Sequence, residues 1–208
     1  MRNTMFGPEV EVGLNLVDCH LIKKCLLIHE DECGDAGYIR QETRSCFFAL
    51  IDGLGHGRAA SMASSAAIHY LESNDDLDLT ELMQGMHGAL IGTRGAVAAL
   101  CRLNLDTGRM DYTGVGNICT RVFGGIDNFR FVPSDGVVGY HLPTLLVKYV
   151  SLSPGDVVML YSDGIKESFE EFECPGLLVG SAEDIAGRVF SHFYKGDDDG
   201  SCLVVRYG

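Results

Sequence analysis

Apolar and polar residues follow two different periods along the chain, and the changes of period divide it into elements. Residues 47–51 are all apolar and lead directly into Asp52, Gly53 and two further glycines within four positions. A short apolar run that ends in glycines is typical of a buried strand followed by a sharp turn. Further strands are predicted by alternation or short apolar runs at 9–17, 25–28, 38–42, 96–105, 110–115, 118–123, 130–133, 145–152, 157–161 and 201–207.

Helical spacing of apolar residues appears in three places. It predicts helices at about 57–73, from 79 onward with Thr80 as N-cap, and at about 182–194 with Ser181 as N-cap. The link at 73–78 is interpreted as a solvated loop whose aspartates are surface charge. Short strands joined by hairpins favour antiparallel sheets, so the predicted class is α+β, a sandwich with helices packed outside it.

The charge of the chain narrows its possible partners. A net charge of −13 argues against nucleic acid and against an anionic membrane surface, and no apolar stretch is long enough to span a bilayer. An acidic chain suits a protein that holds divalent cations, although solubility explains the charge equally well. The eight cysteines show no C-x-x-C pair, and the first residues lack a signal-type apolar segment. We therefore expect a reduced, cytoplasmic protein, although the even number leaves a disulfide framework open.

Acidic residues fall at the boundaries of four predicted strands. Asp52 and Asp163 each end a strand, Asp35 precedes the strand at 38, and Asp198 with Asp199 precedes the last strand. In antiparallel sheets the end of one strand and the start of its neighbour share an edge, so these carboxylates can gather at one rim. Such a cluster needs neutralising cations, and oxygen ligands select Mg²⁺ or Mn²⁺. Asp-Gly is also a common turn sequence, so simple turns remain the alternative at each position.

Several segments, taken in order, resemble a known family. They are Cys33-Gly34-Asp35, residues 49–57 (ALIDGLGHG), Gly114-Val115-Gly116-Asn117, Ser162-Asp163-Gly164 and Asp198-Asp199-Gly200-Ser201. The sequence resembles the metal-dependent protein phosphatase (PPM) family, in the bacterial branch of SpoIIE and the stress-response phosphatases. Within that branch it is similar to small stand-alone members that lack a sensor or receiver domain.

The resemblance implies a fold, a domain and a ligand set. The fold would be a PPM-type antiparallel β-sandwich flanked by helices on both sides (αββα), with residues 1–208 as a single SpoIIE-like phosphatase catalytic domain. Asp35, Asp52, Asp163 and Asp198 would be the catalytic carboxylates. Asp52 would bridge two metal ions, the Gly53 carbonyl would bind one of them, and Asp35 would act through water. Asp163 and Asp198 would hold the other ion, with Asp199 as the alternative to Asp198.

The implied activity is metal-dependent hydrolysis of phosphoserine or phosphothreonine on a partner protein. Two Mn²⁺ or Mg²⁺ ions would activate water for in-line attack. The partner would be a phosphorylated regulatory protein of the stressosome or anti-anti-sigma type, and the enzyme would be a cytoplasmic monomer with no nucleic-acid or membrane partner. The alternatives are a non-catalytic interaction module of the same fold and an unrelated acidic α+β interaction protein. No P-loop or nucleophile elbow supports a nucleotidase or a serine hydrolase.

Four further groups of residues have a structural explanation beside the functional one. Some members of the family bind the substrate phosphate through an arginine near the N-terminus, but Arg2 has no predicted anchor, and Arg40 and Arg44 are expected to be solvated. His56 could act as a general acid, although packing at the helix entry is the simpler role. Asp135-Gly136 imitates the Asp-Gly motif without a leading strand, and we interpret it as a turn.

Overall fold

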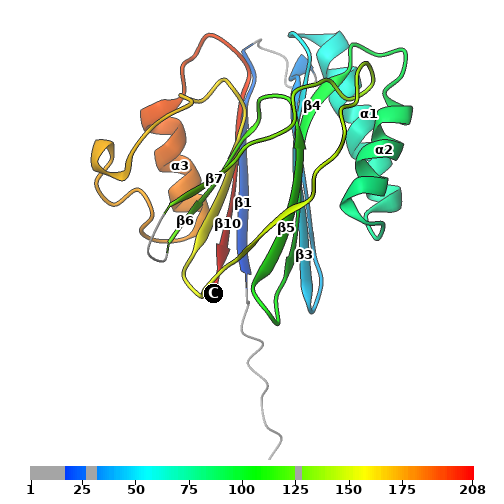
Figure 1. Cartoon of the computed structure of the whole chain (residues 1–208). Helices are drawn as coiled ribbons and strands as arrows, with labels where there is room; N and C mark the ends of the chain where they lie inside the picture. The colour runs from blue at the N-terminus through cyan, green and yellow to red at the C-terminus, as the bar shows by residue number, and fades with distance from the viewer. Residues whose placement is uncertain (1–16, 27–31, 125–127) are drawn as a thin grey trace, which may run out of the picture.

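The chain folds into two antiparallel sheets that pack face to face between layers of helix (Figure 1). The computed structural model describes residues 17–26, 32–124 and 128–208. The strand predicted at 9–17 lies outside the described residues except for Val17, and so do parts of the run at 25–28 and of the hairpin around residue 126. The described residues confirm the α+β sandwich flanked by helices on both sides.

Within the described residues each sheet has five strands, and each sheet contains strands from both halves of the chain. Sheet A has the order β1 (Val17–Lys24), β10 (Gly200–Tyr207), β9 (Val157–Tyr161), β6 (Cys119–Phe123) and β7 (Phe129–Phe131). Sheet B has the order β2 (Asp35–Gln41), β3 (Ser45–Gly53), β4 (Ala96–Asn104), β5 (Arg109–Val115) and β8 (Lys148–Ser151).

The helices cover the outer faces of the sandwich. α1 (Arg58–Asn74) and α2 (Leu79–Ala89) lie on sheet B, and α3 (Ala182–Phe193) lies on sheet A (Figure 1). A short 3₁₀ turn, η2 (Glu171–Glu173), precedes α3. The predicted N-cap Ser181 is confirmed, and its side chain and that of Asp184 form a capping box. None of the helices in the described part of the chain is long and apolar enough to cross a membrane.

Strict alternation along the central strands decides which side chains face the other sheet. Phe48 and Leu50 of β3 belong to the core between the sheets, whereas Ala49 and Ile51 pack against the helices. In the same way Leu160 of β9 faces the inter-sheet core, while its neighbours face α3. Because side chains alternate along a strand, Asp52 and Ser162 continue the rows that face between the sheets.

Two strands differ from their predictions. β1 lies at 17–24, of which only Val17 belonged to a predicted strand, and Cys25 and Leu26 follow it outside any strand. β1 is an edge strand whose side chains are mostly half-buried, so it lacks a clear apolar alternation. β2 begins at Asp35 and not near Tyr38, because the small residues Ala36 and Gly37 pair with β3 despite their low strand propensity.

The loop between α1 and α2 also differs, because it is not simply solvated. Asp78, and not Thr80, is the N-cap of α2, and it accepts hydrogen bonds from the N–H groups of Thr80 and Glu81. Asp75 is buried, and its carboxylate accepts hydrogen bonds from the Tyr38 hydroxyl at 2.6 Å and from Arg40. These hydrogen bonds offset the free-energy cost of burying the carboxylate. The loop therefore anchors the helices to sheet B.

The cysteines mainly fill the core. All eight lie in the described residues, six of them are buried, and none is joined in a disulfide. Burial raises the pKa of the Cys101 thiol well above its usual value. Buried thiols of this kind behave as small apolar side chains.

Candidate active site

Asp35 and Asp52 face each other across two strands at the rim of sheet B. The register of β2 and β3 pairs them directly, and directly paired residues project from the same face of a sheet. That face is the one that packs on sheet A, as the row of Phe48 and Leu50 shows. Asp35 is only 1% exposed and Asp52 is half-buried. The sequence therefore placed both carboxylates at one rim correctly, although Asp35 lies within its strand.

Two serines of sheet A reach across to this pair. The Ser162 hydroxyl donates a hydrogen bond of 2.6 Å to Oδ2 of Asp35. The same hydroxyl oxygen accepts hydrogen bonds from the Ser201 N–H at 2.9 Å and from the Ser201 hydroxyl at 3.2 Å. This chain of bonds joins the ends of β9 and β10 to the start of β2. Sequence reasoning missed Ser162 as a site residue, although its place one step past Leu160 in the inward-facing row was a usable signal.

Asp199 holds the segment that enters β2. Its Oδ1 accepts a hydrogen bond from the Leu26 N–H and its Oδ2 accepts one from the Gly34 N–H, both at 2.7 Å. The residue is buried, so these charge-assisted bonds replace water on the carboxylate. Each oxygen of Asp199 is thus bound to backbone of the segment between β1 and β2.

Asp163 and Asp198 lie on the loops at the same end of sheet A. Asp163 is exposed, and its Oδ2 accepts a hydrogen bond of 3.1 Å from the Asn117 side-chain amide. Asp198 is half-buried, and its Oδ1 accepts the N–H of Asp199 at 2.8 Å, while its backbone carbonyl accepts the Tyr194 hydroxyl at 2.9 Å. Asn117 was part of the family-like turn in the sequence, and the structure now gives it a contact with a predicted ligand.

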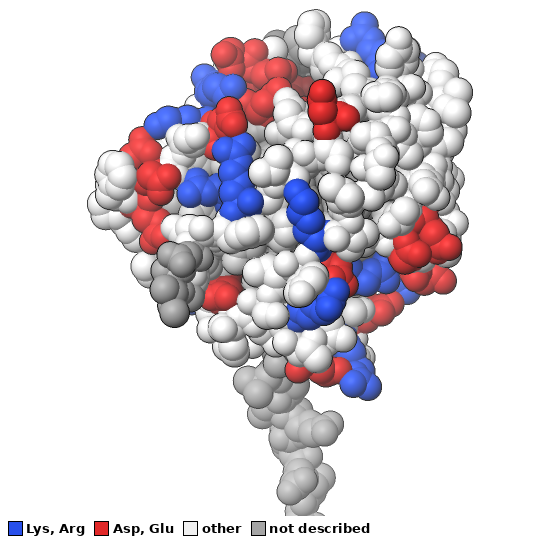
Figure 2. Space-filling model, in the orientation of Figure 1, with Lys and Arg blue, Asp and Glu red and all other residues white. Residues whose placement is uncertain are grey.

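The neighbouring carboxylates change the pKa values of Asp52 and Asp35. The pKa of Asp52 is raised to about 9, first by burial and then by the charges of Asp35, Asp163, Asp198 and Asp199, in that order. Burial also raises the pKa of Asp35 to about 6, although hydrogen bonds from Ser162 and Ser201 oppose the shift. Figure 2 shows acidic side chains gathered on the upper rim, over the loop that precedes β10 in Figure 1. The rim is therefore a region of concentrated negative charge.

Gly53 is required for close packing as well as for the turn. A Cβ at Gly53 would lie 2.2 Å from the Ala60 carbonyl oxygen, so the first turn of α1 can pack on the end of β3 only if residue 53 is glycine. The Gly53 N–H donates to the Gly34 carbonyl at 3.0 Å. A Cβ at Gly34 would lie 3.2 Å from both the Gly53 carbonyl oxygen and Oδ2 of Asp199. The Gly53 carbonyl thus lies beside the carboxylate cluster.

The donor set fits hard divalent cations in its chemistry. Its members are carboxylate and carbonyl oxygens, and a cation would relieve the repulsion that raises the pKa of Asp52. Among the described residues no three His, Cys, Asp or Glu side chains form a closed metal-binding group. The carboxylates surround the rim without converging on one point.

The remaining candidates take other positions. His56 is exposed at the turn between β3 and α1. Arg40 forms ion pairs with Glu42 and the buried Asp75, so it is not simply solvated as expected, and Arg44 pairs with Asp106. Arg2 lies outside the described residues. Asp135 lies in a bend, as expected.

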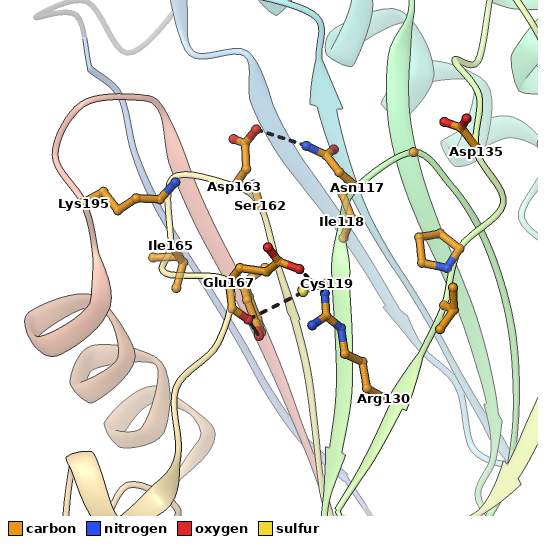
Figure 3. A pocket seen from close by; sticks show the side chains of 14 residues that line it. Asn117, Ile118, Cys119, Arg130, Asp135, Ser162, Asp163, Ile165, Glu167 and Lys195 are labelled. Atoms are coloured by element: carbon orange, nitrogen blue, oxygen red, sulfur yellow. Dashed lines mark hydrogen bonds and ion pairs between the residues drawn. The ribbon is translucent and has the colours of Figure 1, made fainter.

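A pocket that sequence reasoning missed opens beside Asp163. It has a volume of about 380 Å³, and its walls come from the β5–β6 turn, the end of β7 with the following segment, and the segment after β9 (Figure 3). Asp135 lines it together with Asn117 and Asp163. The pocket gives a ligand bound at the carboxylate rim room to extend across the end of the sandwich.

Comparison of the sequence with known proteins gives one family and one relative. The family model described as Stage II sporulation protein E (SpoIIE) matches residues 42–207. Phosphoserine phosphatase RsbX of Bacillus subtilis (strain 168) is 28% identical over 86 residues, which are 41% of this chain and 43% of RsbX. The matched region thus spans less than half the length of that relative.

Solved structures share the fold over almost the whole chain. One, described as "The bacterial stressosome: a modular system that has been adapted to control secondary messenger signaling", is 31% identical with a TM-score of 0.84, and the match covers 91% of this chain and 99% of the other. RsbX in complex with magnesium is 20% identical, with a TM-score of 0.77 over 92% of this chain and 96% of RsbX. The catalytic domain of the serine/threonine protein phosphatase PstP in complex with two manganese ions is 16% identical, with a TM-score of 0.69 over 91% and 97%. The chain therefore belongs to the SpoIIE family and has the fold of the PPM serine/threonine phosphatases.

Proposed function

We propose that the chain is a metal-dependent protein serine/threonine phosphatase that uses two Mn²⁺ or Mg²⁺ ions. The observation that carries this proposal is the direct pairing of Asp35 with Asp52 across β2 and β3, at the rim where Ser162 next to β9 binds Asp35. The charges of Asp163, Asp198 and Asp199 also act on Asp52 and contribute to its raised pKa. A protein keeps such a costly cluster where cations neutralise it. Membership of the SpoIIE family supports the same activity.

The residues of the rim divide into ligands and supports. Asp52, Asp35, the Gly53 carbonyl, Asp163 and Asp198 would hold the ions. When bound, the ions would lower the pKa of a water molecule and neutralise phosphoryl oxygens. Ser162 orients Asp35 through its 2.6 Å hydrogen bond, and Asn117 orients Asp163.

The two aspartates before β10 have different surroundings, which favours one of them as the ligand. Both oxygens of Asp199 accept backbone N–H groups at 2.7 Å, whereas Asp198 is half-buried and its carboxylate accepts one hydrogen bond from the described residues. We therefore propose Asp198 as the metal ligand and Asp199 as its structural support. The Asp199 carboxylate would hold the segment before β2 in place next to Asp35.

The substrate we propose is phosphoserine or phosphothreonine on a regulatory protein of the stressosome or anti-anti-sigma type. This rests on the resemblance to a phosphoserine phosphatase, RsbX, and to a structure described in work on the bacterial stressosome. The open rim supports a protein substrate, because Asp163 and the adjoining pocket are accessible from solvent. We propose residues 1–208 as a single catalytic domain.

The test is release of phosphate from a phosphoserine protein in the presence of Mn²⁺. We expect Asp52→Asn and Asp163→Asn to lower the rate by more than about 100-fold, because even residues that only support a metal ligand contribute 10–100-fold. Asp106→Asn is the matched control, since Asp106 is a surface aspartate at the β4–β5 turn that pairs with Arg44. It should keep full activity.

A non-catalytic interaction module of the same fold predicts a different result. In that case the folded wild-type protein would release no phosphate with Mn²⁺ or Mg²⁺, and Asp52→Asn would change only stability. Equal activity of the wild type and both site variants would also contradict the proposal.

A further inference from the structure

The pocket beside Asp163 includes several residues to which the proposed catalysis gives no role. Its apolar part includes Ile118 and Ile165, and its polar part includes Asn117 and two cations, Arg130 and Lys195 (Figure 3). A pocket at the mouth of an acidic site is an unexpected place for cations in a chain of net charge −13. Their contacts show which of them is available to a ligand.

Arg130 is already neutralised. Its guanidinium donates a hydrogen bond of 2.8 Å to Glu167, which also lines the pocket. Figure 3 shows both side chains in the lower part of the view, below Asp163. Arg130 therefore offers a ligand little net charge.

Lys195 is held rigidly at its backbone and is open at its ammonium group. Its N–H donates to the Gly164 carbonyl at 2.9 Å, and the preceding Tyr194 pairs with Ile165 in an isolated bridge. The residue thus sits directly against the turn that carries Asp163. Its side chain is exposed and extends toward that turn (Figure 3). Among the described residues, no carboxylate oxygen lies within 4.0 Å of this ammonium group, the limit for an ion pair.

A lysine without an anionic partner beside clustered carboxylates is suited to a ligand that brings its own negative charge. The carboxylates repel an approaching anion, and the ammonium offsets this repulsion within the pocket that Lys195 and Asp163 both line. The proposed substrate carries such an anion, a phosphoryl group. We propose that Lys195 binds a phosphoryl oxygen of the substrate, while the protein segment next to the phosphorylated residue lies in the pocket. This inference rests on the proposed phosphatase function.

The test compares Lys195→Gln and Lys195→Arg with the wild type on p-nitrophenyl phosphate and on a phosphoserine peptide. Loss of one charge-assisted hydrogen bond should raise KM for both substrates about tenfold or more. Lys195→Arg should stay within a few fold of the wild type, because it keeps the charge. The Mn²⁺ concentration for half-maximal activity should not change.

Lys166→Gln is the matched control. Lys166 is an exposed lysine on the segment after β9, which lies against the segment of Lys195, and its ammonium binds Glu173 at 2.6 Å. It should leave KM for both substrates unchanged. A rise in KM for the peptide alone in Lys195→Gln would overturn the proposal, because Lys195 would then bind an acidic side chain of the peptide and not the phosphoryl group.

Inorganic phosphate gives a readout that does not need turnover. Calorimetric titration of phosphate into the Mn²⁺-loaded protein should show binding that weakens about tenfold in Lys195→Gln and is unaffected in Lys166→Gln. Unchanged phosphate affinity in Lys195→Gln would overturn the role of Lys195. Phosphate binding that depends on Lys195 in a protein without phosphatase activity would leave the binding site standing and refute the proposed function alone.

Discussion

At the scale of single residues, Asp52 has a more strongly raised pKa than its partner Asp35. It lies against Asp35 in register, and burial with four neighbouring carboxylates raises its pKa to about 9. In the unfolded chain the same group titrates near the ordinary aspartate value of 3.8. The metal-free folded protein therefore keeps a proton that the unfolded chain has released at neutral pH.

This difference predicts how stability depends on pH. A folded-state pKa above the unfolded value stabilises the fold at low pH, and that stability is lost as the pH rises through the folded value. In chelator, the free energy of unfolding should fall between about pH 4 and pH 9, by at most about 1.4 kcal/mol per pH unit for this one proton. Urea unfolding at several pH values measures the slope.

Asp52→Asn is the control for this prediction. The variant cannot titrate at residue 52, so its free energy of unfolding should change less between pH 6 and pH 9 than that of the wild type. Asp35, with a pKa of about 6, contributes mainly below that interval. Equal slopes in the two proteins would contradict the assignment of the raised pKa to Asp52.

The positions of the aspartates at strand ends could be predicted from the sequence, whereas their hydrogen-bond partners could not. Asp35, Asp52, Asp163 and Asp198 stood out because they lie at boundaries of apolar runs. The 2.6 Å bond from Ser162 to Asp35 joins residues 127 positions apart, and nothing local to either residue indicates it. The same holds for the burial of Asp75, whose partners are on another element.

At the scale of elements, the junction between β3 and α1 limits what residue 53 can be. A Cβ there would lie 2.2 Å from a backbone oxygen of α1. Gly53→Ala keeps the carbonyl that would bind metal, yet it should destabilise the protein by more than about 1 kcal/mol, because a strand or a helix must shift. Chemical denaturation measures the change.

Gly88→Ala is the matched substitution for Gly53→Ala. Gly88 lies near the end of α2, and a Cβ there would meet nothing within 4 Å. Alanine should stabilise this helix by about 0.5–1 kcal/mol, since it costs less backbone entropy than glycine. If Gly53→Ala were as stable as Gly88→Ala, the conclusion that α1 packs too close to β3 for a side chain at residue 53 would be wrong.

Strands buried on both faces were predicted well, whereas the edge strand β1 was not. β3, β4, β9 and β10 lie inside their sheets, and apolar runs marked all of them. β1 lies at an edge and ends in Lys23-Lys24, so its sequence resembles a loop. Its hydrogen bonds to β10, paired from Val17↔Tyr207 to Lys24↔Gly200, make it a strand although its side chains do not indicate one.

At the scale of the whole molecule, the site belongs to both sheets. Asp35 and Asp52 come from sheet B, whereas Asp163 and Asp198 come from the loops beside strands of sheet A. A cation bound by all of them would link the two layers of the sandwich. Its binding free energy would then contribute to the stability of the entire fold.

Metal binding should therefore raise the midpoint of thermal unfolding. Mn²⁺ at about 100 times its dissociation constant adds about 2.7 kcal/mol, which for a chain of this size is a shift of about 5–10 °C. Differential scanning calorimetry with and without chelator measures it. Asp52→Asn should abolish most of the shift and Asp106→Asn should keep it. An unchanged midpoint in the wild type would exclude ligands shared by the two sheets.

The position of β10 has a consequence for biosynthesis. β10 follows every other described element along the chain, yet it lies between β1 and β9 in sheet A and directly follows Asp198. During synthesis on the ribosome, β1 and β9 lack their partner strand until β10 has been made. Their backbone N–H and C=O groups on that side stay unpaired and could bind strands of other chains. The carboxylate rim is likewise incomplete until residues 198–207 have left the exit tunnel. The proposed metal site of a nascent chain would thus form in one late step, and a translation product interrupted before β10 would have neither the complete sheet A nor the proposed activity.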